Sequence, residues 1–185
     1  MGIVSMFNYV TLDGFFAGLN GDISWHNFSK DENEVAEDGL QSQNILLFGR
    51  VTYDLMASYW PTPEAQKNDP TIAAGMNKAE KIVFSKTLKK AEWNNTRVIS
   101  GDIGEEVRKL KNAGKNMTIL GSGTIVTQLS ELGLIDEYAF MVNPVVLGAG
   151  RTLFEGIKKS PQFKIKSSKI LSSGNVMLSY VVDNS

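Results

Sequence analysis

The chain has 185 residues, and its 19 lysines and arginines nearly balance 20 aspartates and glutamates, for a formal net charge of −1 at pH 7. This length predicts a single domain over residues 1–185, and the absence of a basic arm or stripe argues against a nucleic-acid partner. Cysteine is absent, which excludes disulfides and thiolate catalysis and fits a reducing cytoplasm. No segment approaches the roughly 18 apolar residues of a membrane span, so we expect a cytoplasmic protein without a membrane partner.

The first predicted elements are a buried strand over residues 3–12, a loop over residues 17–27 and a helix over about 30–42. The start of this helix is predicted from Ser29 and Glu32, which have the S-x-x-E spacing of a capping box. In such a box each side chain bonds a free backbone N–H of the first turn, so the spacing marks a helix N-terminus.

The remaining elements follow from short apolar runs and helical spacing. Strands are expected over 45–48, 81–85, 97–99, 117–120 and 137–147, and a closing hairpin over 162–171 and 176–182. Helices are expected over 51–58, 72–79, 105–112 and 124–132, and the proline-containing segment 61–71 is expected to be a surface loop. Alternating strands and helices followed by strands alone predict an α/β fold with a mainly parallel central sheet and an antiparallel C-terminal edge.

A glycine pair stands where the expected strand at 117–120 meets the following helix. Free N–H groups at a helix start bind anions, and glycines let a phosphate approach the backbone. Gly121 and Gly123 match the first two glycines of the dinucleotide fingerprint, but the third position is Val126, and no Gly-Lys-Ser/Thr follows, so neither a Rossmann motif nor a P-loop is present. Two interpretations stay open here, a phosphate site and a purely structural turn.

His26 is the only histidine of the chain. A Ser-His-Asp triad or a multi-histidine metal site has to be built around this one residue, so hydrolase and metalloenzyme functions are disfavoured and no metal is expected. A chain poor in reactive side chains suits chemistry that is carried by a cofactor.

Seven separated motifs occur in an order and spacing typical of one family: TLDGF (11–15), NGDISW (20–25), LFGRVTYD (47–54), VFSK (83–86), LGSGT (120–124), NPVVLG (143–148) and GRTLF (150–154). With them the chain resembles the dihydrofolate reductase-like superfamily, and within it bacterial proteins similar to the C-terminal reductase domain of the riboflavin-biosynthesis enzyme RibD. The resemblance covers nearly the whole chain and implies a three-layer α/β/α fold. It also implies NADPH as hydride donor.

The resemblance assigns the cofactor contacts to three of these motifs. It implies that the backbone around the glycine pair holds the pyrophosphate, that a second helix start meets the phosphates from the opposite side, and that the end of a further strand contacts the adenosine. The implied residues are Gly121, Ser122, Gly123 and Thr124, then Gly49, Arg50 and Thr52, and finally Ser85 and Lys86. Arg50 is expected to contact the 2′-phosphate through charge-assisted hydrogen bonds; the alternative is a surface arginine at a helix start.

The substrate side of the implied site is less defined. Trp25 matches the tryptophan that follows this loop in dihydrofolate reductases, with a core aromatic as the alternative. Those enzymes carry a carboxylate in the first helix, and Asp31 lies one residue from that position; Asp13 is a second candidate. Asp31 in a first helical turn also interacts favourably with the helix dipole, and Asp-Gly is a common turn, so structural roles stay open for both.

The resemblance therefore implies an NADPH-dependent reductase of a pyrimidine- or pteridine-type substrate, similar to dihydrofolate reductase or to the 5-amino-6-(5-phosphoribosylamino)uracil reductase of riboflavin biosynthesis. The alternative is a non-catalytic NADPH-binding module on the same fold, because a fold does not guarantee its usual activity. A closing antiparallel hairpin and an even surface charge are compatible with a homodimer, which relatives of this type often form.

Overall fold

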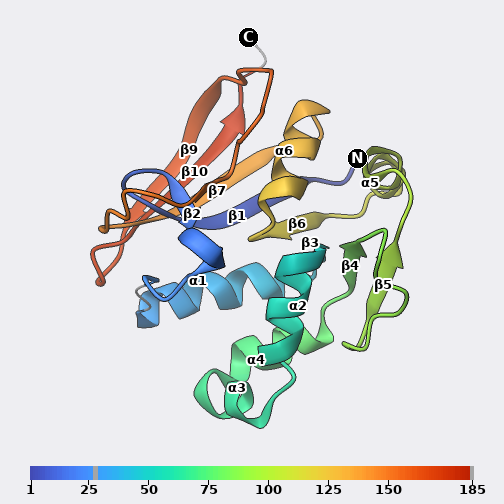
Figure 1. Cartoon of the computed structure of the whole chain (residues 1–185), viewed down its shortest axis with the longest axis horizontal. Helices are drawn as coiled ribbons and strands as arrows, with labels where there is room; N and C mark the ends of the chain where they lie inside the picture. Colours follow the sequence, from blue (N-terminus) through green and yellow to red (C-terminus); the bar gives the residue numbers. More distant parts are fainter. Residues whose placement is uncertain (27–28, 184–185) are drawn as a thin grey trace.

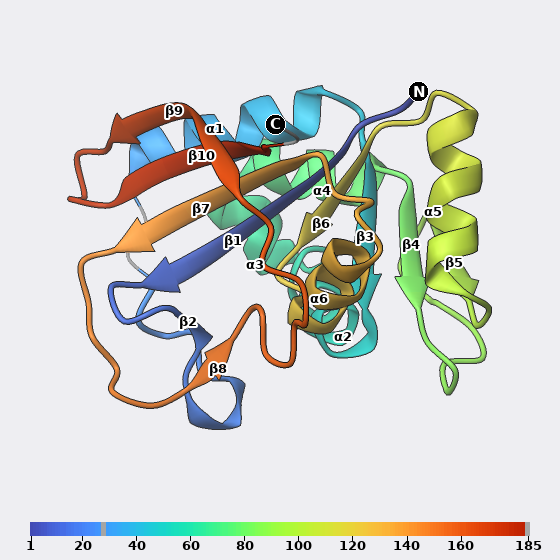
Figure 2. The same ribbon diagram turned by 90° about the horizontal axis from the view of Figure 1, so that it is seen from above.

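The computed structural model describes residues 1–26 and 29–183, and in this part of the chain an 8-stranded sheet lies between helices on both faces (Figure 1). The strand order is β5-β4-β3-β6-β1-β7-β10-β9. Figure 2 shows β5 at one end of this sheet and β9 and β10 at the other. The strand bounds are Val4–Thr11 (β1), Ile45–Gly49 (β3), Lys81–Phe84 (β4), Thr96–Ile99 (β5), Met117–Leu120 (β6), Glu137–Asn143 (β7), Phe163–Ile170 (β9) and Val176–Val182 (β10).

The expected sheet is confirmed. Strands β5, β4, β3, β6, β1 and β7 are parallel to one another, whereas β10 is antiparallel to β7 and β9 is antiparallel to β10. Helices connect the parallel strands along the chain, except between β4 and β5, where residues 85–95 make the crossover without a helix. Their carboxyl ends consequently meet along one edge of the sheet.

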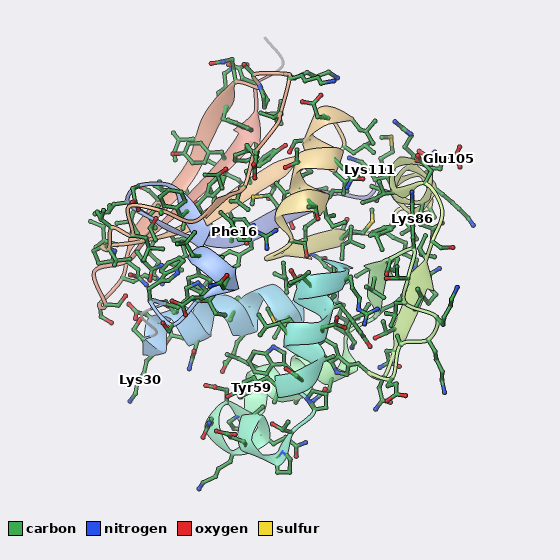
Figure 3. All side chains as sticks on the ribbon, in the orientation of Figure 1. Phe16, Lys30, Tyr59, Lys86, Glu105 and Lys111 are labelled. Carbon is green, nitrogen blue, oxygen red and sulfur yellow. The ribbon has the colours of Figure 1, made fainter. Side chains whose placement is uncertain are left out.

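Two very short strands form a second, separate sheet. β2 (Phe15–Ala17) pairs in antiparallel fashion with β8 (Arg151–Thr152). Neither strand was predicted from the sequence, because two or three residues are too few to show an alternating pattern. This pair fixes Phe16 next to the start of α6 (Gly123–Glu131), where Figure 3 labels its side chain.

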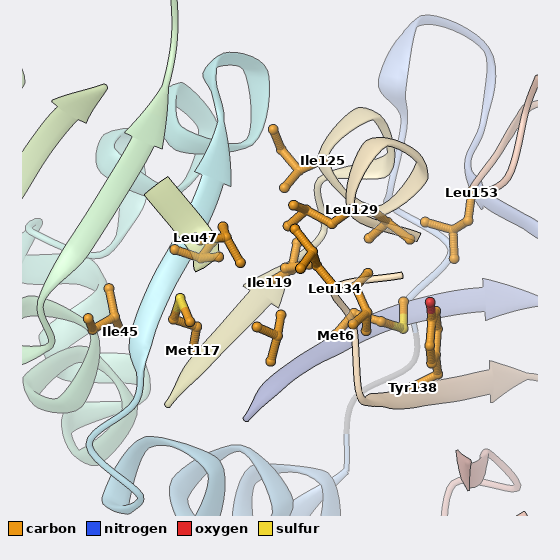
Figure 4. Close-up of a cluster of buried hydrophobic side chains, with 14 of the residues drawn as sticks. Met6, Ile45, Leu47, Met117, Ile119, Ile125, Leu129, Leu134, Tyr138 and Leu153 are labelled. Carbon is orange, nitrogen blue, oxygen red and sulfur yellow. The ribbon is translucent and has the colours of Figure 1, made fainter. Parts of the chain in front are cut away.

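The helices form two outer layers, one on each face of the sheet, and a separate hydrophobic cluster lies under each layer. One cluster joins α5 and α6 to the sheet and contains Val107, Ile125 and Leu129 (Figure 4). The other contains Tyr53 and Met76, from α2 and α4. The remaining helix bounds are Leu19–Gly21 (a 3-10 turn), Lys30–Gln41 (α1), Arg50–Tyr59 (α2), Pro63–Asn68 (α3), Pro70–Lys78 (α4) and Ile103–Asn112 (α5).

The prediction of a surface loop over residues 61–71 is wrong, because α3 and the start of α4 lie in this segment. Pro63 and Pro70 stand at the first positions of these helices, where the missing N–H costs nothing and the fixed φ favours the helix. The side chain of Thr62 caps α3 by accepting a hydrogen bond from the N–H of Ala65 at 3.2 Å. Proline here marks helix starts and does not exclude helices.

Three smaller expectations also need correction. The strand expected to reach 147 ends at Asn143, because proline follows it and cannot donate to the ladder. The expected loop over 17–27 contains the 3-10 turn, and residue 27 lies outside the described residues. The capping box at Ser29 does not form, since its hydroxyl bonds Asp31 at 2.5 Å and caps no backbone N–H.

Candidate functional site

A cavity of about 1730 Å³ opens along the carboxyl ends of the parallel strands β3, β4, β5 and β6. Ligands of open α/β sheets bind at this edge, where loops and helix starts follow the strands. Pockets for a single drug-sized molecule measure roughly 300–1,000 Å³. This cavity therefore has room for a dinucleotide together with a second small molecule.

Two helix starts lie side by side at this edge, because β3 precedes α2, β6 precedes α6, and these two strands are neighbours in the sheet. The buried hydroxyl of Ser122 accepts a hydrogen bond from the N–H of Gly49 at 2.9 Å and donates to the carbonyl of Leu120 at 3.2 Å. The hydroxyl of Thr52 donates to the carbonyl of Gly121 at 3.2 Å. The structure thus brings the two predicted phosphate-binding motifs into direct contact.

The surroundings of Gly121 and Gly123, in the turn before α6, favour glycine at both positions. Gly121 has φ +62°, the left-handed region that glycine tolerates best. A Cβ on Gly123 would lie 2.9 Å from Cζ of Phe16, so a larger residue there requires the Phe16 ring to shift. At the neighbouring Gly49, a Cβ would be 3.6 Å from Oγ1 of Thr124, which places Thr124 at the contact between the two helix starts. The turn is thus tightly packed, because the ring of Phe16 lies against Gly123 and the N–H of Gly121 donates to the carbonyl of Phe7 at 3.3 Å.

Neither of these helix starts has a side-chain cap, at Gly49 for α2 or at Ser122 for α6. Helix α5 differs, because Oδ1 of Asp102 accepts a hydrogen bond from the N–H of Glu105 at 2.8 Å. Uncapped N–H groups and the positive end of the helix dipole together attract anions. The arrangement suits a phosphorylated ligand.

Three further predicted cofactor residues line the same cavity, namely Arg50, Ser85 and Lys86. Nε of Arg50 is 2.6 Å from Oδ2 of Asp54, one turn further along α2. The hydroxyl of Ser85 accepts from the backbone N–H groups of Thr87 and Leu88, at 3.3 and 3.0 Å, and so shapes the turn after β4. Figure 3 shows Lys86 and Phe16 on opposite sides of α6.

Aromatic and imidazole rings line the other end of the cavity. The rings of Tyr9 and His26 are stacked with centroids 4.5 Å apart. Burial lowers the pKa of His26 to about 4, so this ring is neutral at pH 7. Burial, together with the charge of Glu32, raises the pKa of Tyr9, so its hydroxyl stays protonated. Trp25 packs edge-on against His26 at 4.3 Å, behind the ring that faces the cavity.

The two predicted catalytic aspartates lie outside the cavity lining and tie loops together. Asp31 accepts hydrogen bonds from the N–H and the hydroxyl of Ser172, both at 2.7 Å. Asp13 accepts from the hydroxyl of Thr11 at 2.6 Å and from the N–H of Gly148 at 2.7 Å. Side-chain hydrogen bonds, to Asp31 from Ser29 and to Asp13 from Thr11, are the main reason that the pKa of each carboxyl lies below its ordinary value. These contacts explain both residues structurally, and catalysis by either stays a prediction.

Glu32, next to Asp31, is the buried carboxylate that the sequence did not single out. It is 2% exposed, and its Oε1 accepts from Nδ2 of Asn175 at 2.6 Å and from the hydroxyl of Ser173 at 2.8 Å. Within the described residues, its Oε2 has no hydrogen-bond partner. The S-x-x-E spacing assigns this residue to a capping box, and nothing local in the sequence indicates its contact with a hairpin more than 140 residues away.

Metal and membrane expectations can be examined only over residues 1–26 and 29–183. There, no group of three or more His, Cys, Asp or Glu side chains is placed to hold a metal ion. Over the same residues, no helix has the length and apolar character needed to cross a membrane.

Comparison with known proteins points to one family. The sequence model of the RibD C-terminal domain matches residues 3–177. The uncharacterized protein YyaP of Bacillus subtilis (strain 168) is 35% identical over 172 residues, which are 92% of this chain and 90% of YyaP.

Two solved structures have the same fold. A putative riboflavin biosynthesis protein from Shewanella sp. PV-4 superposes with a TM-score of 0.78 at 21% identity, covering 98% of this chain and 99% of that one. The dihydrofolate reductase of Enterococcus faecalis, solved in complex with NADP(H) and RAB-propyl, gives a TM-score of 0.66 at 15% identity, covering 99% and 98% of the two chains. At these identities the likeness extends to the fold alone.

Proposed function

The chain belongs to the RibD C-terminal domain family, and on this basis we propose that it is a reductase that uses NADPH to reduce a pyrimidine- or pteridine-type substrate. Family and neighbouring folds support an oxidoreductase. The observation that carries the proposal is the pair of uncapped helix starts at Gly49 and Ser122, joined by a 2.9 Å hydrogen bond at the edge of a large cavity.

The residues present fit a phosphorylated dinucleotide. Gly121 and Gly123 carry no side chains of their own, and the ring of Phe16 and a methyl group of Thr52 lie against them. Arg50, directly after β3, and Lys86, after β4, are cations that line the cavity. A 2′-phosphate contact would require Arg50 to share its guanidinium with Asp54 or leave it, which an exposed ion pair permits at little cost.

Reduction of a C=N or C=O bond adds a hydride to carbon and a proton to nitrogen or oxygen. NADPH, when bound, supplies the hydride. The chain contributes Tyr9 and His26 at the far end of the cavity, both neutral at pH 7, so they bind an uncharged heterocycle without a charged group to desolvate. The hydroxyl of Tyr9 would orient the heteroatom of the bond being reduced, and the proton would come from water.

We propose that Glu32, in place of Asp31, is the carboxylate that serves this end of the site. Its charge acts on Tyr9, and its position is fixed by Ser173 and Asn175. Glu32 does not line the cavity, so its proposed role is indirect, through its charge on Tyr9. Burying a carboxylate with one oxygen unpartnered among the described residues costs free energy. Groups kept in such surroundings are candidates for a functional role.

The test is a binding and turnover experiment with the purified protein. NADPH binding is measured by nucleotide fluorescence, and the loss of reduced-nicotinamide absorbance is then followed with dihydrofolate, other pteridines and the ribosylaminouracil as substrates. Binding followed by turnover of at least one of these rings supports the proposal. Binding without any turnover supports the alternative, a non-catalytic NADPH-binding module, and no binding excludes both.

A further inference from the structure

Asn8 occupies a position where the pattern of β1 places core residues. It stands between Met6 and Val10 on the same face of the strand, and all three are buried. Asn8 is only 3% exposed, yet within the described residues its Nδ2 has no hydrogen-bond partner. Native proteins almost always satisfy a buried amide, so one that is left unsatisfied requires an explanation.

The neighbours of Asn8 belong to the candidate site. Asn8 lines the cavity, and its Oδ1 lies 3.8 Å from the position of a Cβ on Gly121, below the turn that leads into α6. On the other side of this turn, Phe16 packs against Gly123. The amide therefore stands next to the uncapped N-terminus of α6, which has nine residues.

Strand order indicates which part of a dinucleotide reaches Asn8. The sheet runs β4-β3-β6-β1, and the proposed contacts follow this order: Lys86 after β4 for the adenosine, Arg50 after β3 for the 2′-phosphate, and Gly123 after β6 for the pyrophosphate. The next strand is β1, which carries Asn8. The half of the dinucleotide beyond the pyrophosphate, which is the nicotinamide half, consequently lies over β1.

We propose that Asn8 is a cofactor-binding residue whose side-chain amide donates a hydrogen bond to the carboxamide oxygen of the nicotinamide. The inference rests on the proposed use of NADPH. The amide is already desolvated in the free protein, so binding gains the bond without a new loss of hydration. The donor also discriminates against ligands that have no acceptor at this position, because they leave the amide unpaired.

The test substitutes Asn8→Leu, which keeps a similar volume and removes both polar atoms. We expect the dissociation constant for NADPH, measured by nucleotide fluorescence, to rise about tenfold, the effect of losing one hydrogen bond. We expect no change in the dissociation constant for 2′-phospho-ADP-ribose, which has the pyrophosphate and the 2′-phosphate and lacks the nicotinamide. The thermal midpoint of the free protein should stay the same or rise, because an unsatisfied amide is replaced by an apolar side chain.

Asn143→Leu is the matched control for stability. Asn143 is a buried asparagine on the neighbouring strand β7, and its Nδ2 donates to the carbonyl of Met141 at 3.2 Å. Its substitution should lower the thermal midpoint. An equal drop in Asn8→Leu would give Asn8 a structural role and overturn the inference.

The binding outcomes separate this inference from the proposed function. If the unaltered protein does not bind NADPH, the proposed function fails. If it binds NADPH and Asn8→Leu binds it equally well, only the inference fails. Equal weakening of NADPH and 2′-phospho-ADP-ribose would place the amide at a phosphate and overturn the assignment to the nicotinamide.

Discussion

Replacing Ser122 by alanine should uncouple the two helix starts that form the proposed phosphate site. The hydroxyl of Ser122 is buried, accepts from the N–H of Gly49 at 2.9 Å and donates to the carbonyl of Leu120 at 3.2 Å. The alanine variant loses both bonds and leaves the buried N–H of Gly49 without its partner. A lost hydrogen bond costs about 1 kcal/mol and an orphaned buried donor about 1–3 kcal/mol, so we expect the free energy of unfolding to fall by about 2–3 kcal/mol.

The assay is urea denaturation at pH 7, followed by thermal unfolding of the same samples. For a chain of this length, the expected loss corresponds to a decrease in Tm of roughly 4–12 °C. Ser58→Ala is the control, because the hydroxyl of Ser58 is exposed on the same helix that begins at Gly49, and it bonds only the carbonyl of Leu55, at 2.7 Å. A change of less than about 0.5 kcal/mol in Ser122→Ala, equal to that of the control, would refute the idea that this hydroxyl joins the helix starts.

Three further predictions concern ligand binding, pH and turnover. Arg50→Ala should weaken NADPH binding by about tenfold or more and leave NADH binding nearly unchanged, since a charge-assisted hydrogen bond contributes roughly 1.5–3 kcal/mol. Equal losses for both nucleotides would show that Arg50 does not contact the 2′-phosphate. Asp54→Ala, which removes the ion-pair partner of Arg50, should not weaken NADPH binding. Burial lowers the pKa of His26 to about 4, so the folded state resists protonation of this ring. The free energy of unfolding should therefore decrease as pH falls from about 6.5 towards 4. A proton NMR titration of this single histidine gives the pKa directly, and a value near 6.5 would contradict the burial argument. Glu32→Gln should lower kcat by about tenfold or more, whereas Asp31→Asn should affect mainly the midpoint of thermal unfolding; a larger loss of kcat in Asp31→Asn would reverse the assignment.

The sequence predicted the sheet, and the position of the proposed cofactor motifs at one edge of it, because the signals for strand ends are local. Apolar runs that end in glycine mark the carboxyl ends of β3 and β6, and the residues that follow, Arg50 and Thr124, therefore had to lie at one edge. The contact between these two helix starts follows from β3 and β6 being neighbours. Motifs on strand ends are thus placed correctly as soon as the strand order is right.

The substrate side was harder to predict because its contacts are distant in the sequence. One residue along a helix rotates a side chain by about 100°, so Asp31 and Glu32 point in different directions. Asp31 reaches Ser172 in a loop, and Glu32 is buried against Asn175. The residue that becomes buried depends on where the β9–β10 hairpin lies, and no pattern around residue 31 contains this information.

The glycine turn at 121–123 is a structural corner and also the proposed phosphate site. Its side chains build the corner: the hydroxyl of Ser122 bonds the N–H of Gly49, and Phe16 fills the space beside Gly123. Its backbone N–H groups at the start of α6 remain without a side-chain cap. Since side chains fix the turn while the main chain faces the cavity, the two interpretations of this motif describe different atoms of the same residues. Rigid placement of the corner is also what an anion site needs, because donors that are already oriented lose little entropy when a phosphate binds.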